Sequence, residues 1–491
     1  MYKIDFGRTL YLADTDNVLF LQLEAPITSI SAAAEFLEFV SEYAPYDQIK
    51  LVSVPGIAPG VPFERLRQPF PYMAVTTVAE FDADALARGF EAAVASALHR
   101  SIKPELLVLY QFRGAVTGNR FFGREHQVQA LLRHPRVSYL VTGARMSGKT
   151  SLLLETKRQL ENQYRSEAVE IAYVDCREAT TVPGLFHTIL LKLDELSTYA
   201  RIERWTPPER WPQFFRYLRG RAKRTKHRRL YLFLDEVDHM VELENRFDFN
   251  LTWQFRALHQ TNSQENGYIQ FVLAGSKRLA AAQKNLATGL HNFVNSEDCK
   301  LNNFDLGTTR AMLERPLQDA GIEVDDLQAM ANDLLRVTGG RPASVQYVCS
   351  QMVNRMLARR LPGLTTNLLS EVVASNAYLE FYEATLRENT DLLDRFVLST
   401  GERQMNHKAG FSLEDIYAEA QRLKLPVNEA EIHESLADLD NAGFIRPKDD
   451  GVKAPYVIAA PVILQIARRR SPEQLAPDII ARWKSQGRGP Q

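Results

Sequence analysis

The stretch VSYLVTGARMSGKTS, residues Val137 to Ser151, decides the fold of the chain. It opens with a short apolar run typical of a buried strand. Gly143 to Thr150 then has the pattern G-x-x-x-x-G-K-T, and a helical pattern begins at Leu152. Strand, glycine-bounded turn and helix in this order are the context in which the pattern binds phosphate. The stretch therefore predicts a phosphate-binding loop at the edge of a parallel α/β sheet.

Each fixed position of this loop pattern has a physical task. Gly143 and Gly148 let the backbone curl close to phosphate groups without a Cβ clash. The following helix points its positive N-terminal end at them. Lys149 is expected to reach the β- and γ-phosphates of ATP, and the Thr150 hydroxyl to bind Mg²⁺. The loop residues expected to bind nucleotide are Gly143, Ala144, Arg145, Met146, Ser147, Gly148, Lys149, Thr150 and Ser151.

A second signal lies in Leu230 to Met240, which reads LYLFLDEVDHM. Its apolar half predicts a buried parallel strand, and the acids emerge at the carboxyl end, where open α/β sheets bind ligands. We expect Asp235 to hold Mg²⁺ directly or through water, and Glu236 to orient the attacking water as general base. Asp238 is placed to position this machinery. Lys149, Asp235 and Glu236 are thus the expected catalytic residues, with Thr150 and Asp235 as metal ligands.

Two further residues each have two interpretations. The apolar run Ile269 to Ala274 predicts another buried strand, and Ser276 follows it. Ser276 is a candidate sensor of the γ-phosphate, or it is part of a simple turn. Arg256, on the predicted helix Leu251 to His259, is a candidate to act on a neighbouring molecule's nucleotide. An ordinary surface ion pair is the simpler interpretation of Arg256.

Composition narrows the class of protein. The 491 residues are 45% hydrophobic and 24% charged, with a net charge of −1, as in ordinary soluble globular proteins. The three cysteines lie far apart with no C-x-x-C pair, which argues against a zinc ribbon or a disulfide framework. The chain shows neither a signal-peptide pattern nor a long apolar run. We therefore expect a soluble cytoplasmic protein that does not enter membranes.

One segment carries a strong local charge. Arg216 to Arg229 contains eight Lys and Arg residues and no acid. It is a candidate for binding nucleic acid, an acidic partner or a neighbouring subunit. The simpler interpretation is a solvated helix end and loop, because the aromatic residues of the segment are not interleaved with the basic ones as in a base-stacking groove.

Residues 1–114 predict a small N-terminal α/β domain. Without a nucleophile–base pair, it reads as a regulatory or protein-contact module rather than an enzyme. Its expected elements are a β-hairpin of Thr9 to Leu12 and Val18 to Leu23, helices Ser29 to Tyr43 and Ala85 to His99, and strands Leu51 to Val54 and Leu106 to Tyr110.

After Gly307 the pattern becomes helical. Gly339 and Gly340 end one helix, and Pro342 begins the next. Near the end, helix Glu429 to Asn441 is followed by two short strands around a charged turn, which predicts a winged helix. The expected domains are the N-terminal module 1–114, a P-loop core 115–303, a helical lid 304–375, and a winged-helix domain with tail 376–491.

With these motifs in order, the chain resembles STAND-class signal-transduction ATPases, in the AAA-like clade that also holds the origin-recognition ATPases. The motifs that carry the resemblance are Phe122 to Glu125, Gly143 to Leu153, Leu234 to Asp238 and Gly340 to Pro342. The resemblance implies that Phe122, Gly123 and Arg124 lie near the adenine and that lid residue Pro342 contacts the nucleotide. It implies an α/β P-loop NTPase fold of the ASCE/AAA-like type, with a lid and a winged helix that closes over the nucleotide at rest.

The implied mechanism is a switch. ADP would hold core, lid and winged helix closed, and ATP would free them to assemble through the cores, with a protein partner or further copies bound through the N-terminal domain. No arginine finger is evident, so slow hydrolysis is expected. The class usually carries a C-terminal repeat array, and no such period is visible here.

Three other classes of nucleotide-binding protein are alternatives to a signal-transduction ATPase. In a DNA-loading ATPase of origin-recognition or transposition-regulator type, the winged helix reads DNA, yet Glu429 to Asn441 carries acids and no Lys or Arg. A non-hydrolysing scaffold is disfavoured by the intact Lys149, Asp235 and Glu236. A helicase would need a second RecA-like core, which the sequence lacks.

Overall fold

The computed structural model divides the chain into two compact units. The first comprises Met1–Phe122, Gly307–Asn332 and Gln346–Val372, and the second Gly123–Leu306, Asp333–Val345 and Val373–Gln491. The structure describes residues 18–43, 49–63, 73–88, 93–94, 97, 108–134, 136–164, 168–194, 211–225, 229–247, 251–264, 268–276, 294–295, 298–448 and 456–485.

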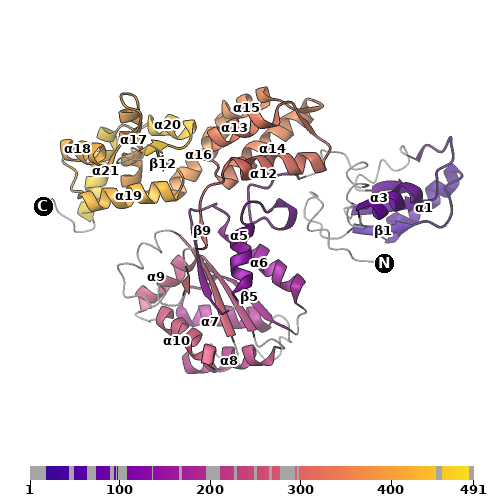
Figure 1. The fold of residues 1–491 in the computed structure, drawn as a ribbon, viewed down its shortest axis with the longest axis horizontal. Coiled ribbons are helices and arrows are strands. Elements are labelled where there is room, and N and C mark those ends of the chain that lie inside the picture. Colours follow the sequence, from indigo (N-terminus) through magenta and orange to yellow (C-terminus); the bar gives the residue numbers. More distant parts are fainter. Residues whose placement is uncertain are drawn as a thin grey trace. The chain divides into compact units, whose positions relative to one another are not determined.

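A parallel sheet forms the core of the Gly123–Leu306 part of the second unit (Figure 1). Its strand order is β5-β6-β7-β4-β8, with β9 also paired to β4, and every pairing is parallel. This confirms the predicted parallel core, and the carboxyl ends of its strands share one edge. The strands are β4 (Ser138–Gly143), β5 (Glu170–Asp175), β6 (Arg229–Asp235), β7 (Tyr268–Gly275), β8 (Val294–Asn295) and β9 (Lys300–Leu301).

Helices cover this sheet (Figure 1). Leu230, Leu232 and Leu234 of β6 are fully buried in one apolar cluster with side chains from helices α7, α8, α9 and α10. A strand buried on both faces needs such a continuous apolar run, which is why LYLFL folds at the centre. The helices are α5 (Glu125–Arg133), α6 (Lys149–Gln163), α7 (Val182–Asp194), α8 (Trp211–Arg224), α9 (Val237–Phe247) and α10 (Leu251–Gln264), with short 3-10 turns η2 (Gly118–Arg120) and η3 (Cys176–Glu178).

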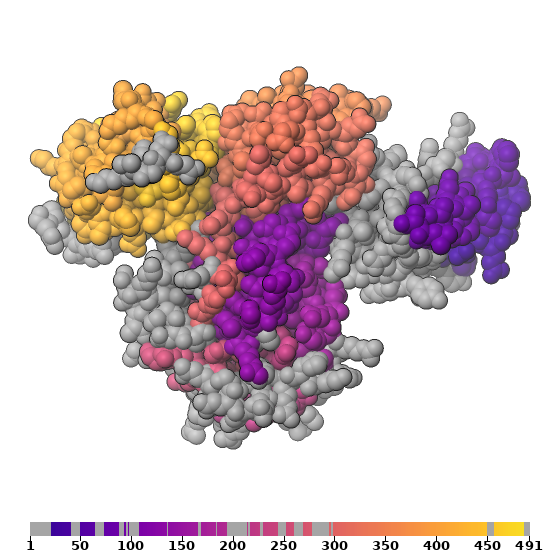
Figure 2. All heavy atoms as spheres, in the orientation of Figure 1, coloured from indigo at the N-terminus to yellow at the C-terminus, as the bar shows by residue number. Residues whose placement is uncertain are grey.

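The C-terminal part of the second unit is a helical body built around α17. Its atoms pack closely at the yellow end of the colour scale in Figure 2. Asp391, Ser412 and Asn428 begin α17, α18 and α19 with capping boxes, which fix the three helix starts. The elements are α16 (Asn376–Asn389), α17 (Leu392–Met405), α18 (Leu413–Arg422), α19 (Glu429–Asn441), the antiparallel pair β12 (Ile445–Pro447) and β13 (Tyr456–Ile458), α20 (Pro461–Ala467) and α21 (Pro472–Ser485).

The first unit contains a three-stranded sheet of its own. Strands β1 (Val18–Gln22), β2 (Ile49–Val54) and β3 (Met73–Thr77) are parallel in the order β1-β2-β3. Helices α1 (Ile30–Tyr43) and α3 (Val78–Arg88) follow β1 and β3. The remaining elements between 306 and 373 are α12 (Leu306–Asp319), β10 (Glu323–Val324), α13 (Leu327–Thr338), α14 (Pro342–Ala358), β11 (Gly363–Leu364) and α15 (Thr366–Val373).

Several expectations for the N-terminal residues were wrong. Val18–Gln22 pairs in parallel with β2, which differs from the expected hairpin, whose other half, Thr9 to Leu12, lies outside the described residues. In the expected helix Ala85 to His99, the described residues 85–88, 93–94 and 97 are helical, but its start was misplaced, because α3 begins at Val78, where Thr77 caps it by accepting from the Glu80 amide. In the expected strand Leu106 to Tyr110, residues 108–110 form no strand. Strand β3 was not predicted.

In the described part of the chain, no helix combines the length and the apolar character needed to cross a bilayer.

Candidate functional site

The predicted phosphate loop connects β4 to α6 at the carboxyl edge of the sheet. A Cβ on Gly143 would lie 2.4 Å from Ser147 Oγ and 3.1 Å from Leu301 Cβ, so a larger residue would displace the Ser147 hydroxyl and press on Leu301. At Gly148 the reason is different, because nothing would lie within 4 Å of a Cβ. Its φ of +95° is instead a conformation that other residues adopt only with strain. Both glycines are therefore required, one for space and one for backbone geometry.

Lys149 and Ser147 give this loop its binding chemistry. Lys149 Nζ donates to the carbonyls of Gly143 (3.0 Å) and Ala144 (3.1 Å), so the ammonium group lies within the loop. Burial lowers the pKa of Lys149, while the carboxylates of Glu236 and Asp235 act to raise it. The Ser147 hydroxyl is buried and has no hydrogen-bond partner among the described residues. A buried hydroxyl in that state fits a missing acceptor such as a phosphate oxygen.

The loop contacts the predicted acid pair directly. Thr150 Oγ1 donates to Asp235 Oδ2 at 2.6 Å, across the gap between α6 and the end of β6. The Tyr173 hydroxyl donates to the same oxygen at 3.0 Å, and the Glu236 amide donates to Oδ1 at 2.9 Å. Asp235 is only 2% exposed, so these bonds fix its carboxylate. The two predicted metal ligands are therefore adjacent.

Tyr173 was not predicted. Burial first, and then Asp235, raise the pKa of Tyr173, which keeps its hydroxyl protonated and a donor. It lies two residues before the end of β5, the strand beside β6. That position was its only signal in the sequence, because a tyrosine in a strand is usually part of the core.

Glu236 lies just beyond β6 with a left-handed backbone, φ +52°. Its carboxylate is 3.6 Å from Arg177 Nη1, and Arg177 also pairs with Asp175 at 2.6 Å. Burial acts to raise the pKa of Asp175, but the hydrogen bonds from Arg177 outweigh it and lower that pKa. The paired carboxylate raises the pKa of Arg177 in turn. Arg177, also missed from the sequence, thus places a permanent cation beside Glu236.

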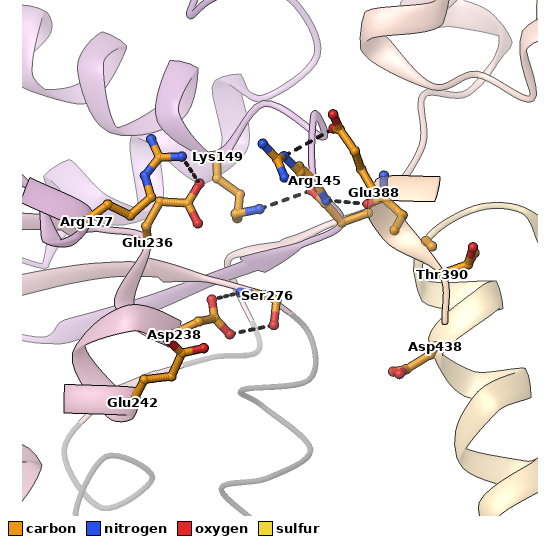
Figure 3. Close-up of a pocket in the computed structure, with 13 residues that line it drawn as sticks. Arg145, Lys149, Arg177, Glu236, Asp238, Glu242, Ser276, Glu388, Thr390 and Asp438 are labelled. Atoms are coloured by element: carbon orange, nitrogen blue, oxygen red, sulfur yellow. Dashed lines mark hydrogen bonds and ion pairs between the residues drawn. The ribbon is translucent and has the colours of Figure 1, made fainter. Parts of the chain in front are cut away.

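Ser276 and Asp238 form a pair at the end of β7. The Ser276 amide and hydroxyl each donate to the Asp238 carboxylate at 2.6 Å (Figure 3). The serine expected at the strand end and the acid expected to position the machinery therefore act on each other. Arg256 has a different environment, since its guanidinium lies 4.7 Å from the ring centre of Trp253 on α10.

These groups face a cavity of 480 Å³ (Figure 3). Lys149, Glu236 and Ser276 line it together with Arg177. The other side comes from residues far along the chain that the sequence did not point to. The full lining is Ala144, Arg145, Lys149, Arg177, Glu236, Asp238, Glu242, Ser276, Glu388, Asn389, Thr390, Asp438 and Ala442.

The residues expected near the adenine hold local structure. The Phe122 ring is buried, with the Arg315 guanidinium 6.0 Å from its centre. The Gly123 amide donates to Glu125 Oε1 at 3.1 Å. Arg124 is buried, donates to the Asn302 carbonyl and lies 4.8 Å from the ring centre of Phe304. Burial lowers the pKa of Arg124 to about 10. Neither Gly123 nor Arg124 lines the cavity.

Pro342 is the first residue of α14, as its position after two glycines predicted. The neighbouring Arg341 makes the more notable contacts. It is 2% exposed, donates to the carbonyls of Ala442 (2.9 Å) and Arg145 (2.6 Å), and lies 4.8 Å from the ring centre of Phe444. Burial lowers the pKa of Arg341 to about 10. In the sequence, Arg341 is marked only by its place in the Gly340 to Pro342 motif at a predicted helix start.

The basic segment Arg216 to Arg229 divides into structural and exposed residues. Arg221 is buried, where it donates to the Leu193 carbonyl at 2.6 Å and pairs with Glu170 at 2.9 Å. Lys223 and Arg224 are exposed, and residues 226–228 lie outside the described residues. At least one of the eight basic residues therefore serves packing.

Part of this chain is similar in sequence to a known domain family, and its fold is similar to solved structures. Residues 133–282 match the family model described as an AAA domain. The ORC2 protein of Aeropyrum pernix, in ADPNP–ADP complexes, is 14% identical over 74% of this chain and 95% of that chain, with a TM-score of 0.51. No curated protein matches the chain.

Two other solved structures are similar at lower scores. The A. pernix ORC1 protein in complex with DNA is 16% identical, over 74% of this chain and 94% of that chain, with a TM-score of 0.40. A Thermotoga maritima RuvB mutant is 15% identical, over 69% and 92%, with a TM-score of 0.37. The AAA match and the likeness to ORC2 identify a P-loop NTPase fold of the AAA type with a parallel sheet core.

Proposed function

We propose that this chain, whose residues 133–282 match an AAA domain, is an ATPase that binds Mg²⁺ and ATP and hydrolyses the ATP slowly. The observation that carries the proposal is the 2.6 Å contact between Thr150 and Asp235. It places a hydroxyl and a carboxylate side by side next to the loop, and oxygen ligands of this kind are the ones Mg²⁺ prefers. Bound there, Mg²⁺ would neutralise charge that develops on the phosphates.

Residues of the loop and of the neighbouring strand ends have separate tasks in this proposal. The amides of the loop and Lys149 bind the phosphates, and the Ser147 hydroxyl adds a donor. Glu236 accepts the proton of the attacking water as that water bonds to the terminal phosphorus and the bond from this phosphorus to the oxygen that leaves with ADP breaks. Ser276 stays the proposed sensor of the terminal phosphate; its one hydroxyl hydrogen is donated to Asp238 in this structure and would turn from Asp238 to the phosphate when ATP binds. Phe122, Gly123, Arg124 and Pro342 stay proposed contacts of the adenine side.

We further propose that hydrolysis serves a switch, ADP-closed and ATP-open, of the signal-transduction type. In this proposal residues 1–114 form the sensing or assembly module, 115–303 the core, 304–375 the lid and 376–491 a winged helix. The helices α17 to α19 followed by the antiparallel pair β12–β13 support the winged helix. The free, buried Cys176, Cys299 and Cys349 support a reducing compartment such as the cytoplasm.

The alternative is a DNA-loading ATPase of the origin-recognition or transposition-regulator type, which the ORC2-like fold favours. In α19, the exposed Glu429 and Glu434 would repel a DNA backbone. Duplex binding measured against salt concentration separates the two functions. A steep, ATP-dependent salt slope would favour the alternative, and binding that is weak at all salt concentrations would favour the switch.

The decisive experiment compares wild type with Glu236→Gln, which keeps the size of the side chain and removes the base. We expect ATP turnover to fall by about a hundredfold or more, the usual contribution of a general base, with ATP affinity retained. Glu242→Gln, six residues further along the chain in α9, removes another carboxylate of the cavity lining that has no assigned role, so it is the matched control and should keep turnover. Equal turnover in wild type and Glu236→Gln would contradict the proposed role of Glu236.

A further inference from the structure

Arg145 of the phosphate loop is held by residues that follow the sheet in sequence (Figure 3). Its amide donates to Asn389 Oδ1 at 2.8 Å, and its carbonyl accepts from Arg341 at 2.6 Å. Its half-exposed guanidinium pairs with Glu388 at 3.3 Å. Backbone and side chain of one loop residue are thus all engaged by groups outside the loop.

The contact from Asn389 has a defined orientation. Asn389 Nδ2 donates to the Thr385 carbonyl at 2.7 Å, one turn back in α16. Because its amide group donates to its own helix, the oxygen end faces the loop and accepts from Arg145. The last turn of α16 therefore presents a fixed acceptor to a phosphate-loop amide.

Arg341 ties the same loop residue to the turn after α19. One end of its guanidinium donates to Arg145 and the other to Ala442, while its Nε has no hydrogen-bond partner among the described residues. A buried cation with an unmet donor is held at a free-energy cost. The hydrogen bonds of Arg341 to Arg145 and Ala442 can therefore be given up when a competing interaction is available.

A phosphate group would provide that competition. Loop amides are the groups with which a phosphate loop binds its ligand, and an amide that donates to Asn389 is not available to a phosphate oxygen. In such loops the lysine reaches the β- and γ-phosphates. The last phosphate of a triphosphate thus lies toward Lys149, in the cavity whose other side carries the carboxylates of Glu388 and Asp438. A diphosphate brings less negative charge to these acids.

Building on the proposed function, we propose that Asn389 makes this site discriminate between nucleoside diphosphates and triphosphates. Its bond to Arg145 is compatible with a diphosphate and is displaced by the third phosphate. Displacement frees the end of α16 from the Arg145 amide, while Arg341 still joins the Arg145 carbonyl to the turn after α19. The nucleotide state is thereby transmitted to residues 376–485.

The test is the ratio of affinities for fluorescent ADP and a fluorescent non-hydrolysable ATP analogue. In Asn389→Ala, triphosphate affinity should rise by about tenfold relative to diphosphate affinity, the effect of one hydrogen bond. Hydrogen exchange in the last turn of α16 should rise without nucleotide. Asn376→Ala, an exposed residue at the other end of α16, is the matched control and should match wild type in both measurements.

Glu388→Gln supplies a second variant of nearly unchanged size. Removing its charge should shift the ratio in the same direction by about threefold, as for an exposed ion pair. An unchanged ratio in folded Asn389→Ala and Glu388→Gln, with wild type binding both nucleotides, would overturn the discrimination while leaving the proposed ATPase intact. Failure of wild type to bind either nucleotide would overturn both.

Discussion

The phosphate loop with its acid pair and the N-terminal sheet β1–β3 differ in how far sequence predicts them. In the loop, chemistry fixes residue types at fixed spacings, and Lys149, Thr150, Asp235 and Ser276 lie at the edge where the pattern puts them. In the N-terminal sheet only burial matters, and many apolar sequences satisfy burial. The comparison shows that a binding function leaves more information in a sequence than packing does.

The largest expected effect of a substitution in either region is at Lys149 of the phosphate loop. We expect Lys149→Ala to reduce ATP affinity by about a thousandfold, because charge-assisted bonds to two phosphates are lost. Titration with a fluorescent ATP analogue measures this. Lys157→Ala, in the same helix α6 but paired with Glu161 at the surface, is the control and should bind normally. Normal binding by a folded Lys149→Ala protein would refute the assignment of the loop.

A substitution in the core of the N-terminal sheet should lower stability and leave ATP turnover unchanged. Leu51→Ala in β2 removes a fully buried side chain and should lower the free energy of unfolding of this region by about 3 kcal/mol. Thermal unfolding followed by calorimetry measures the loss. Leu86→Ala is the control, since that side chain is 90% exposed and should change stability by less than about 0.5 kcal/mol. Loss of ATP turnover in a folded Leu51→Ala protein would show that this sheet takes part in the chemistry.

Two threonines of helix α6, Thr150 and Thr156, separate an effect on metal binding from an effect on helix stability. Thr150→Val removes the hydroxyl that contacts Asp235 and should reduce Mg²⁺-dependent ATP affinity by about tenfold. Thr156→Val, two turns along α6, loses a bond from its hydroxyl to the Leu152 carbonyl and should alter stability only. Titration with and without Mg²⁺ distinguishes them. If both variants lose affinity equally, the effect belongs to the helix and not to a metal ligand.

The smallest effect concerns Asp175 and pH. The folded protein lowers the pKa of Asp175 below its ordinary 3.8, so its carboxylate binds a proton less readily than in the unfolded chain. This stabilisation is present above that pH and is lost as the pH falls through the lowered value. Asp175→Asn should therefore flatten the acid limb of stability by less than about 1 kcal/mol, because Arg177 is half-exposed. Urea unfolding between pH 2 and 6 measures it, and an unchanged acid limb would contradict the pairing.

The limits of prediction follow from how each residue acts. The sheet core was predictable because a strand buried on both faces needs a continuous apolar run. The loop and the acid pair were predictable because the proposed phosphate and metal chemistry restricts residue type. Arg341 and Asn389 were not, because they bind backbone groups of Arg145, and a backbone group leaves no mark on the sequence of its partner. Strand β3 was missed since Met73–Thr77 is short and lies close to a run rich in proline and glycine.

The left-handed backbone of Glu236 has a consequence for how the protein can change over time. Glycine would relax that conformation, because it adopts positive φ at no steric penalty, while any other residue is strained there by about 1 kcal/mol. Replacement of Glu236 by glycine would therefore stabilise the backbone but remove the carboxylate beside Arg177. If Glu236 has the proposed role, stability and ATP turnover place opposite demands on this residue, and keeping the glutamate costs stability.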